Sequence, residues 1–498
     1  MPIPVESFFL PEGVSGSLQQ RIRAMVAEGI LSGRFRAGEK MPSSRGLAAH
    51  LGVSRITVTL AYTELVSSDY LTSRGRSGYF VSDGVPVQPG FRPAPRAPGT
   101  VDWEALCGGR FSRMERVERP EDWRAYPYPF IYGQADPALF DHQNWRLCAL
   151  QALGRREFET LTADRYERDD PLLIEYLLRN ILPRRGIEAR PGEVLVTMGA
   201  QNALWLAAQV LLRPGGHAVV ENPGYPGFRA MVAQAGARVT PVAVDEGGLV
   251  VEALPSGVDV VFTTASHQRP TNATMPVARR TALLRAAEER DFLVVEDDYE
   301  FEMSYLTPVS PSIKSLDSGG RVVHAGSFSK SIFPGLRLGW LVGPEPFIRE
   351  ARALRAQVLR HPPGQLQRTA AHFLSLGHYD ALVNRMKAAF AKRRKAMEEA
   401  ISLQGLTVAG QGGFGGSSFW MEAPEGVDAE ALALRLRRDG VLIEPGRVFF
   451  HPGTERRNFY RLAYSSIPVG KIGEGIALVA RAMREVPGQA RDGVGNWT

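Results

Sequence analysis

The stretch GSFSKSIFPGLRLGW, residues 326–340, contains one lysine, Lys330, between serines and directly after an apolar run typical of a buried strand. An ammonium at the mouth of such a strand must lose water or find a partner, which costs free energy. The neighbouring Ser327, Ser329 and Arg337 supply two hydroxyls and a guanidinium, which are groups that bind phosphate oxygens. A phosphate-bearing carbonyl compound beside an amine would form a Schiff base, so this stretch predicts a pyridoxal phosphate site at Lys330.

Three other segments supply groups that this cofactor would need. Residues 196–206, VTMGAQNALWL, form a strand–glycine–helix pattern, and the amides at a helix N-terminus bind phosphate. Residues 292–302, FLVVEDDYEFE, end an apolar strand with carboxylates, one of which would hold the proton on the pyridine nitrogen. Tyr299 can meet the phenolate oxygen, and Tyr225 in ENPGYPGF can stack on the ring. Each also has an ordinary explanation: the acidic residues can be solvated, Tyr225 can be core, and Arg337 can pair with a surface carboxylate.

A proline- and glycine-rich stretch, residues 82–100, divides the chain. After it, apolar strands alternate with longer amphipathic segments, which is typical of a doubly wound α/β domain with buried parallel strands. The expected division is an N-terminal module of residues 1–82, a linker of residues 83–130 and an α/β domain of residues 131–498, with subdomains at about 131–360 and 361–498.

The N-terminal module carries two short helix patterns joined by a tight turn. Ser43 or Ser44 can cap the first helix, Gly52 breaks it, and Ser54 can cap the second. This arrangement predicts a helix-turn-helix, whose second helix can enter the major groove of DNA.

A two-stranded wing is expected after these helices, with its turn at Gly75 to Gly78 and arginines at its tip. Upstream, residues 34–60 hold five basic side chains against one acidic side chain, and such a surface attracts DNA phosphates. The alternative is a small three-helix protein-interaction module with solvated arginines.

The length and composition limit the number of domains, the partners and the cellular compartment that we expect. The 498 residues suggest two or three domains, and a net charge of +6 permits a nucleic-acid partner without requiring one. The two cysteines have no metal-ligand spacing, which indicates a reducing compartment and no metal site. No targeting or membrane-spanning pattern is present, so we expect a cytoplasmic protein with no membrane partner.

The N-terminal motifs PSSRGLAAHLGVSRITVTLAYTEL and SGYFV resemble the winged helix-turn-helix of GntR-type bacterial repressors. The resemblance implies binding to a double-stranded DNA operator. The side chains expected at the DNA by this resemblance are Arg45, Ser54, Arg55 and Thr57, with Gly78 at the wing.

From about Tyr132 onward the chain resembles the fold-type I, aspartate aminotransferase-like pyridoxal phosphate enzymes, through the motifs quoted above and through SHQRPTNATMP and FYRLAYS. A winged helix, a proline-rich linker and this domain together resemble the MocR/GabR subfamily of GntR regulators. The roles implied are a covalent cofactor bond at Lys330, the pyridine nitrogen partner at Asp297, the phenolate contact at Tyr299, ring stacking at Tyr225, phosphate binding at Ala200, Gln201, Ser327, Ser329 and Arg337, and a ligand carboxylate at Arg461.

One position departs from the aminotransferase pattern. Aspartate aminotransferases carry asparagine before Pro-Thr-Gly, where it touches a cofactor oxygen, whereas this chain has Arg269 there and Asn272 in place of the glycine. Arg269 can reach an effector, point to solvent or pack against its neighbours.

The resemblance implies a pyridoxal phosphate-dependent transcriptional regulator that senses an amine or amino acid through an external aldimine, as a head-to-tail homodimer. The main rival is an active aminotransferase with an appended DNA-binding module. A weaker one is an interaction module on a dead aminotransferase scaffold. The sequence leaves open the effector (amino acids, γ-aminobutyrate, taurine and diamino acids all qualify), the operator, the target genes, activation or repression, and any transamination.

Overall fold

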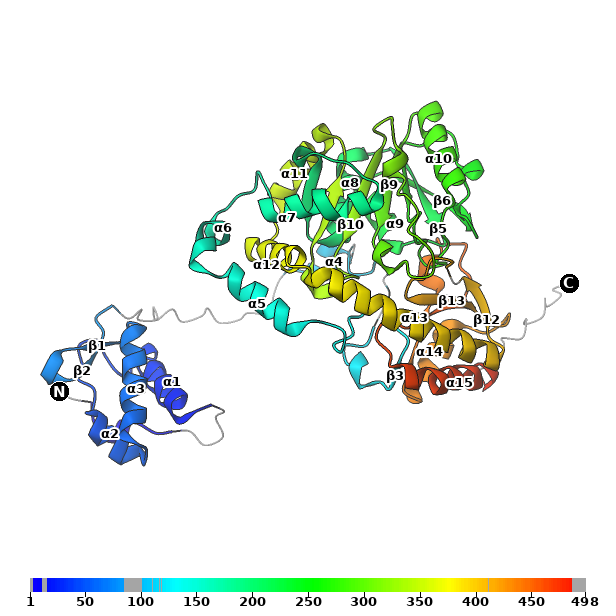
Figure 1. Ribbon diagram of the computed structural model, residues 1–498. Helices are drawn as coiled ribbons and strands as arrows, with labels where there is room; N and C mark the ends of the chain where they lie inside the picture. The colour runs from blue at the N-terminus through cyan, green and yellow to red at the C-terminus, as the bar shows by residue number, and fades with distance from the viewer. Residues whose placement is uncertain are drawn as a thin grey trace. The chain divides into compact units, whose positions relative to one another are not determined.

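The computed structural model describes residues 3–10, 16–84, 101–109, 111–115, 117, 119–410 and 412–485, in two compact units, Met1–Gly108 and Gly109–Thr498 (Figure 1). Residues 85–100, which make up most of the proline- and glycine-rich stretch, lie outside the described residues. None of the described helices combines the length and the apolar content needed to cross a bilayer.

The first unit has the predicted helix-turn-helix and wing. Ser43 and Ser54 cap the two helices of the motif, and Gly52 ends the first of them with a φ of 66°. The apolar faces of all three helices meet in one core, in which Val26, Leu47 and Val58 have no exposed surface. The elements are α1 (Leu18–Leu31), α2 (Ser44–Leu51), α3 (Arg55–Ser67), the antiparallel strands β1 (Leu71–Ser73) and β2 (Tyr79–Val81), and α4 (Trp103–Cys107).

The second unit is built on an eight-stranded sheet. Its order is β4 (Val194–Thr197), β11 (Gly339–Val342), β10 (Val322–Ser327), β9 (Leu293–Asp298), β8 (Val260–Thr263), β5 (His217–Asn222), β6 (Arg238–Asp245) and β7 (Gly248–Leu249). The run from β10 to β6 is parallel, which confirms the doubly wound prediction for the centre of the sheet. At the edges β11 runs antiparallel to β10 and β4, and β7 runs antiparallel to β6.

Helices cover both faces of this sheet (Figure 1). One face, which includes Val295 and Ala325, packs against α8 (Gly199–Leu211), α9 (Pro226–Gln234) and α11 (Glu345–Leu359). The other, which includes Val294, packs against α10 (Val277–Arg290).

A second, smaller sheet lies in the C-terminal part of this unit. It has the antiparallel order β12 (Thr407–Gly410), β13 (Ser418–Glu422), β16 (Phe459–Ala463) and β15 (Glu444–Pro445). The remaining elements are α5 (His142–Ala152), α6 (Phe158–Thr162), α7 (Pro171–Tyr176), α12 (Gly364–Ser375), α13 (His378–Gln404), α14 (Ala429–Arg438), α15 (Val469–Glu485), and β3 (Tyr128–Pro129) paired in parallel with β14 (Val441–Leu442).

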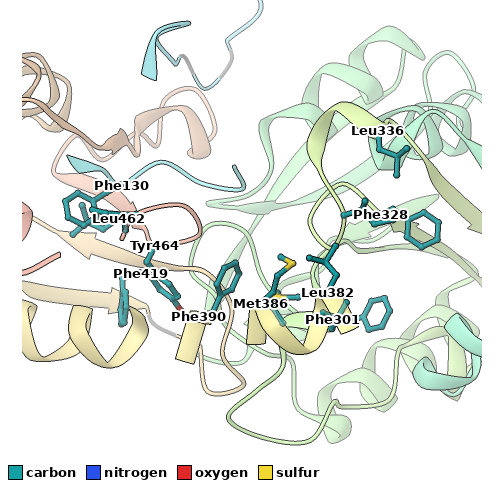
Figure 2. Close-up of a cluster of buried hydrophobic side chains, with 14 of the residues drawn as sticks. Phe130, Phe301, Phe328, Leu336, Leu382, Met386, Phe390, Phe419, Leu462 and Tyr464 are labelled. Carbon is teal, nitrogen blue, oxygen red and sulfur yellow. The ribbon is translucent and has the colours of Figure 1, made fainter. Parts of the chain in front are cut away.

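One hydrophobic cluster joins the two parts of this unit (Figure 2). Phe328 and Leu336 enter it from the segment that carries Lys330, Met386 enters from α13, and Leu462 enters from β16. Burying such side chains contributes about 1.5–3 kcal/mol each. The lysine segment is therefore anchored in the core on both sides of Lys330.

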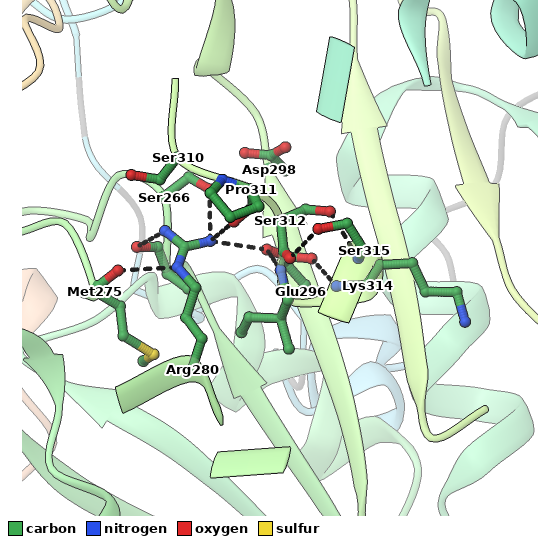
Figure 3. Close-up of polar contacts among 12 residues, drawn as sticks. Ser266, Met275, Arg280, Glu296, Asp298, Ser310, Pro311, Ser312, Lys314 and Ser315 are labelled. Carbon is green, nitrogen blue, oxygen red and sulfur yellow. Dashed lines mark hydrogen bonds and ion pairs between the residues drawn. The ribbon is translucent and has the colours of Figure 1, made fainter. Parts of the chain in front are cut away.

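Strand β9 ends in three consecutive carboxylates that alternate between the two faces of the sheet. Glu296 and Asp298 share the α10 face with Val294, and Asp297 faces the α8 side with Val295. On the α10 face, Arg280 lies 3.7 Å from Glu296, which also accepts hydrogen bonds from the amides of residues 313 and 314 (Figure 3).

The carboxylates on the α10 face are neutralised by cations. Arg185 Nε donates to Asp298 Oδ2 at 2.5 Å, with both side chains fully buried. Burial would raise the pKa of Glu296, but His324 and Arg280 together hold it below its usual value. Asp297 makes no ion pair with a described residue, so the three carboxylates divide into two structural ones and a free one.

Replacing Arg185 tests this division. The change Arg185→Met should lower the free energy of unfolding by about 3–5 kcal/mol, because it leaves Asp298 as a buried charge without its partner. Urea unfolding measures the difference. Arg190→Met is the matched control, because Arg190 pairs with Glu193 at the surface and its loss should leave the unfolding midpoint nearly unchanged. Equal midpoints for the two variants would contradict the structural role of the buried pair.

Candidate functional site

Lys330 lies against an aromatic ring that the sequence did not point to. Its Nζ is 4.4 Å from the centre of the Tyr132 ring, and the next residue, Gly133, has a φ of 68°. A Cβ at position 133 would come within 1.9 Å of Nζ and would displace the amine, and the positive φ also favours glycine there. Burial and the nearby charge of Arg269 lower the pKa of Lys330 to about 7, so much of the amine is neutral, as a nucleophile must be.

Asp297 offers a carboxylate with an open acceptor. Its Oδ1 is buried and has no hydrogen-bond partner among the described residues. Burial raises the pKa of Asp297 to about 7, although the charge of Arg269 opposes that rise. An unpaired buried carboxylate is costly, and a protonated ring nitrogen would remove that cost. Asp297 therefore fits its predicted role, and the buried position excludes the solvated alternative.

The predicted phosphate ligands gather around the N-terminus of α8. Gly199 opens this helix with a φ of 77°, and a Cβ there would lie 3.0 Å from the Arg337 guanidinium. Arg337 donates to the Met198 carbonyl at 3.1 Å and has no carboxylate partner among the described residues, so the surface ion-pair alternative fails. The Ser329 amide donates to Ser327 Oγ at 3.1 Å, and Ser329 Oγ is buried without a described partner.

These groups form an anion site by their chemistry, with a guanidinium, a free hydroxyl and helix N-terminal amides. Ala200 and Gln201 lie in the first turn of α8, as predicted. The Gln201 side chain is exposed, so the group that Gln201 contributes to the anion site is its backbone amide at the N-terminus of α8.

The two predicted tyrosines occupy different environments. Tyr299 is buried, and its hydroxyl donates to the main-chain oxygen of His267 at 3.0 Å. Burial and the charge of Glu300 raise the pKa of Tyr299 well above its usual value. Tyr225 is half-buried at the start of α9 and packs edge-on against Phe228, with ring centres 5.4 Å apart.

Arg461, the predicted carboxylate ligand, is already ion-paired. It is buried in β16, and its Nε and Nη2 donate to Glu444 Oε2 at 2.8 and 2.6 Å. The same carboxylate accepts hydrogen bonds from Arg119 at 3.4 Å and from the Tyr132 amide at 3.2 Å. The guanidinium also stacks 4.1 Å from the centre of the Tyr132 ring.

Arg269 points into the site and not to solvent. Its guanidinium lies 4.7 Å from the centre of the Tyr225 ring and 5.6 Å from that of Tyr132. Asn272, three residues later, has a φ of 64° and donates to the Ser418 carbonyl at 3.0 Å. Asparagine tolerates this left-handed conformation better than most residues, which explains how it replaces the glycine of the aminotransferase pattern.

A buried glutamate completes the site and was missed by the sequence analysis. Glu300 accepts hydrogen bonds from Tyr132 at 2.6 Å and Ser417 at 2.5 Å, and it pairs with His267 at 2.8 Å. Burial opposes its charge, but these partners lower the pKa of Glu300 to about 2. Its place directly after Tyr299 was the only local signal.

In the first unit, the residues predicted to contact DNA lie at the start of α3 and in α2. Arg45 and Arg55 are exposed, and neither forms an ion pair with a described residue. Ser54 caps α3 through the Thr57 amide, and the hydroxyls of Ser54 and Thr57 bind each other at 2.7 Å. Gly78 has a φ of 97° in the wing, so a residue with a side chain would be strained there.

Comparison with known proteins gives the same two parts. Residues 18–81 match the family described as bacterial regulatory proteins, gntR family, and residues 152–474 match aminotransferase class I and II. The chain is 68% identical to the HTH-type transcriptional regulator TauR of Rhodobacter capsulatus, over 97% of this chain and all of the relative. It is 31% identical to the probable rhizopine catabolism regulatory protein MocR of Rhizobium meliloti, over 76% of this chain and 75% of the relative.

The chain belongs to the MocR/GabR subfamily of GntR-type transcriptional regulators. Among solved structures it is similar to the α-aminoadipate aminotransferase of Thermus thermophilus complexed with N-(5'-phosphopyridoxyl)-L-leucine, with a TM-score of 0.69, 26% identity and coverage of 78% of this chain and 99% of the other. It is also similar to the kynurenine aminotransferase of Pyrococcus horikoshii, with a TM-score of 0.66, 27% identity and coverage of 74% of this chain and 95% of the other.

This MocR/GabR regulator therefore has an aminotransferase-like domain whose cofactor is pyridoxal phosphate. Its unpaired Asp297, its free Ser329 hydroxyl and the guanidinium beside Gly199 fit the ring nitrogen and the phosphate of that cofactor. The cofactor supplies a carbonyl carbon that condenses with a primary amine.

Covalent attachment of the cofactor should depend on pH through Lys330. With a pKa of about 7, the rate at which apoprotein binds pyridoxal phosphate covalently should rise through pH 7 and then level off, because only the neutral amine attacks. A lysine with an ordinary pKa of about 10.4 would give a rate that keeps rising to that pH. The visible absorption band, fixed by borohydride, reports the reaction.

Two variants locate the attachment. Lys330→Ala should lose the band, and Lys314→Ala, which removes an amine paired with Asp317 at 2.9 Å, should keep it. A persistent band in Lys330→Ala would show that another amine holds the cofactor.

Proposed function

We propose that this regulator senses a small primary amine that carries an acidic group. The observation that carries the proposal is the combination, around the Tyr132 ring, of the poised amine of Lys330 with the guanidiniums of Arg461 and Arg269. With the cofactor bound, the primary amine of the effector would take the place of the Lys330 amine, which would be released as a free amine, and the acidic group would bind to a guanidinium. Asp297 and the groups around Gly199 would hold the cofactor.

The response is a shift between two arrangements of the protein. A ligand moves such an equilibrium only by its differential affinity for the two arrangements. The exposed side chains of Arg45 and Arg55 contact the operator, together with the wing at Gly78. A protein that binds an operator works in the cytoplasm, where we expect this regulator. Ser54 and Thr57, which bond to each other, act there mainly through the orientation of α3.

The regulator acts as a head-to-tail homodimer, in which each DNA-binding unit rests on the aminotransferase-like domain of the partner. Support comes from its similarity to the other members of its subfamily and from an apolar surface on the second unit. Four large apolar side chains there are each more than half exposed: Leu147 and Leu150 on α5, Leu153 at the C-cap of α5, and Phe158 on α6. Apolar side chains gathered in this way favour association with another protein surface.

An active aminotransferase is the second candidate function. It is favoured by Lys330, whose lowered pKa suits proton transfer, and by the free carboxylate of Asp297. A sensor needs the same two groups to exchange one amine for another. The residues of the site therefore do not distinguish the two functions, whereas the rate of transamination does.

Arg55 tests the DNA-binding face. Arg55→Ala should weaken operator binding and leave the cofactor absorption unchanged. A contact to a guanine edge would cost about 1–3 kcal/mol at one base position, whereas a phosphate contact would weaken binding to all sequences alike. Gel-shift titration at fixed salt measures the loss. Arg23→Ala is the control, since Arg23 pairs with Glu64 between α1 and α3; equal affinities for both variants would exclude α3 as the reading helix.

Regulator and enzyme differ in what an amine does to DNA affinity. An effector amine should change both the visible spectrum and the operator affinity, the latter by a coupling free energy of about 1–3 kcal/mol. Transamination should be slow or absent. Turnover at about 1 per second or faster, with operator affinity indifferent to the amine, would favour the catalytic function.

A further inference from the structure

Three guanidiniums influence the Lys330 amine, and two of them share one carboxylate. Arg119 and Arg461 both donate to Glu444, at distances of 2.6–3.4 Å. Arg269 forms no ion pair with a described residue, and its Nε is buried without a hydrogen-bond partner in the described part of the chain. Of these three guanidiniums, Arg269 is therefore the one without a carboxylate partner among the described residues.

The surroundings of Arg269 leave its donor edges open. Aromatic rings pack against the guanidinium, with the centres of Tyr225, Tyr132 and Phe449 at 4.7, 5.6 and 5.9 Å. Ring contacts of this kind stabilise a cation without using its N–H groups. The planar edge of the guanidinium can then bind two oxygens of one acid group.

The backbone under Arg269 is fixed by a second buried carboxylate. Glu221 accepts hydrogen bonds from Thr264 Oγ1 at 2.5 Å and from Gln268 Nε2 at 3.1 Å. Thr264 Oγ1 in turn accepts from the Arg269 amide at 3.1 Å, and Gln268 Nε2 donates to the Arg269 carbonyl at 3.0 Å. The backbone of Arg269 is therefore fixed by a network of buried hydrogen bonds, which fixes the position from which its side chain extends.

We propose that Arg269 is the specificity-determining residue for the acidic group of the effector. This inference rests on the proposed function and deepens it. Lys330 Nζ, Arg269 Cζ and Arg461 Cζ all lie within 6 Å of the centre of the Tyr132 ring, so the ligand class is a short amino acid whose amine and acid groups are separated by few carbons. Arg461 contributes less, because Glu444 already occupies two of its nitrogens.

A competing role for Arg269 is a contact with an oxygen of the cofactor, since asparagine holds that position in the resembling aminotransferases. The two roles differ in what they predict for amines without an acid group. A cofactor contact affects every amine alike, whereas an acid receptor affects only amines that carry the acid.

The test uses the full-length protein with its cofactor and three probes of similar size, β-alanine, taurine and n-propylamine. The change in visible absorption on titration gives each affinity, and gel-shift titration with and without the probe gives the effect on DNA. In Arg269→Gln, the affinity for the acid-bearing probe that wild type prefers should fall about tenfold to hundredfold, with that for propylamine unchanged. Arg269→Lys should keep part of the preference, because it keeps the charge.

Controls separate folding from recognition. The starting spectrum of each variant reports an intact cofactor site, and Arg290→Gln on α10, which removes a guanidinium bonded to the Leu254 carbonyl, should change none of the affinities. If Arg269→Gln failed to fold, Arg269→Lys would still test the proposal. An Arg269→Lys variant with no preference for the acid-bearing probe over propylamine would overturn the proposal.

Each remaining outcome is decisive. Equal loss for all three probes, with an altered starting spectrum, would assign Arg269 to the cofactor and overturn the proposal. An unchanged preference in Arg269→Gln that is lost in Arg461→Gln would overturn it in favour of Arg461. A wild-type protein whose spectrum responds to none of the probes would overturn the proposed function and this inference with it.

Discussion

The alternation of side chains along β9 is the constraint on which the site depends. Three consecutive carboxylates cannot face one side of a strand, so Glu296 and Asp298 turn to α10 and Asp297 turns to α8. The outer two are stabilised by buried cations from distant segments, Arg280 and Arg185. The middle one stays unpaired beside the helix whose N-terminus collects the phosphate-binding groups. Neutralising all three would have removed the open acceptor that fits the ring nitrogen of the cofactor.

Much of this could be predicted because the decisive groups are local in the sequence. Lys330, its flanking serines and Arg337 lie within eleven residues, and the caps at Ser43 and Ser54 define the helix-turn-helix within a dozen more. Alternation also predicts that Asp297 opposes its neighbours. Which face carries the cofactor does not follow from the strand itself, because that depends on where α8 packs.

The parts that sequence reasoning missed depend on contacts between distant residues. Tyr132 and Glu300 are 168 positions apart and share a hydrogen bond, and Glu444 reaches Arg119 across 325 positions. No pattern within either segment indicates such a pair. Arg461 is an example: the sequence predicts that it binds a ligand carboxylate and does not indicate that Glu444 is already bonded to it. Arg269, which looked like a departure from the aminotransferase pattern, lies beside Lys330 without the carboxylate partner that Arg119 and Arg461 have among the described residues.

Glu444 connects Arg461 to the N-terminal part of the second unit. Arg269 can accept an anion without breaking an existing pair, whereas an anion on Arg461 must compete with Glu444 and its buried charge. Glu444 also holds Arg119 and the Tyr132 amide, which belong to the first part of the second unit in the sequence. An acid group that engages Arg269 alone leaves these contacts intact, and one that also displaces Glu444 from Arg461 releases them. The two binding modes therefore differ in the contacts that hold Arg119 and Tyr132, and a population shift requires such a difference in contacts.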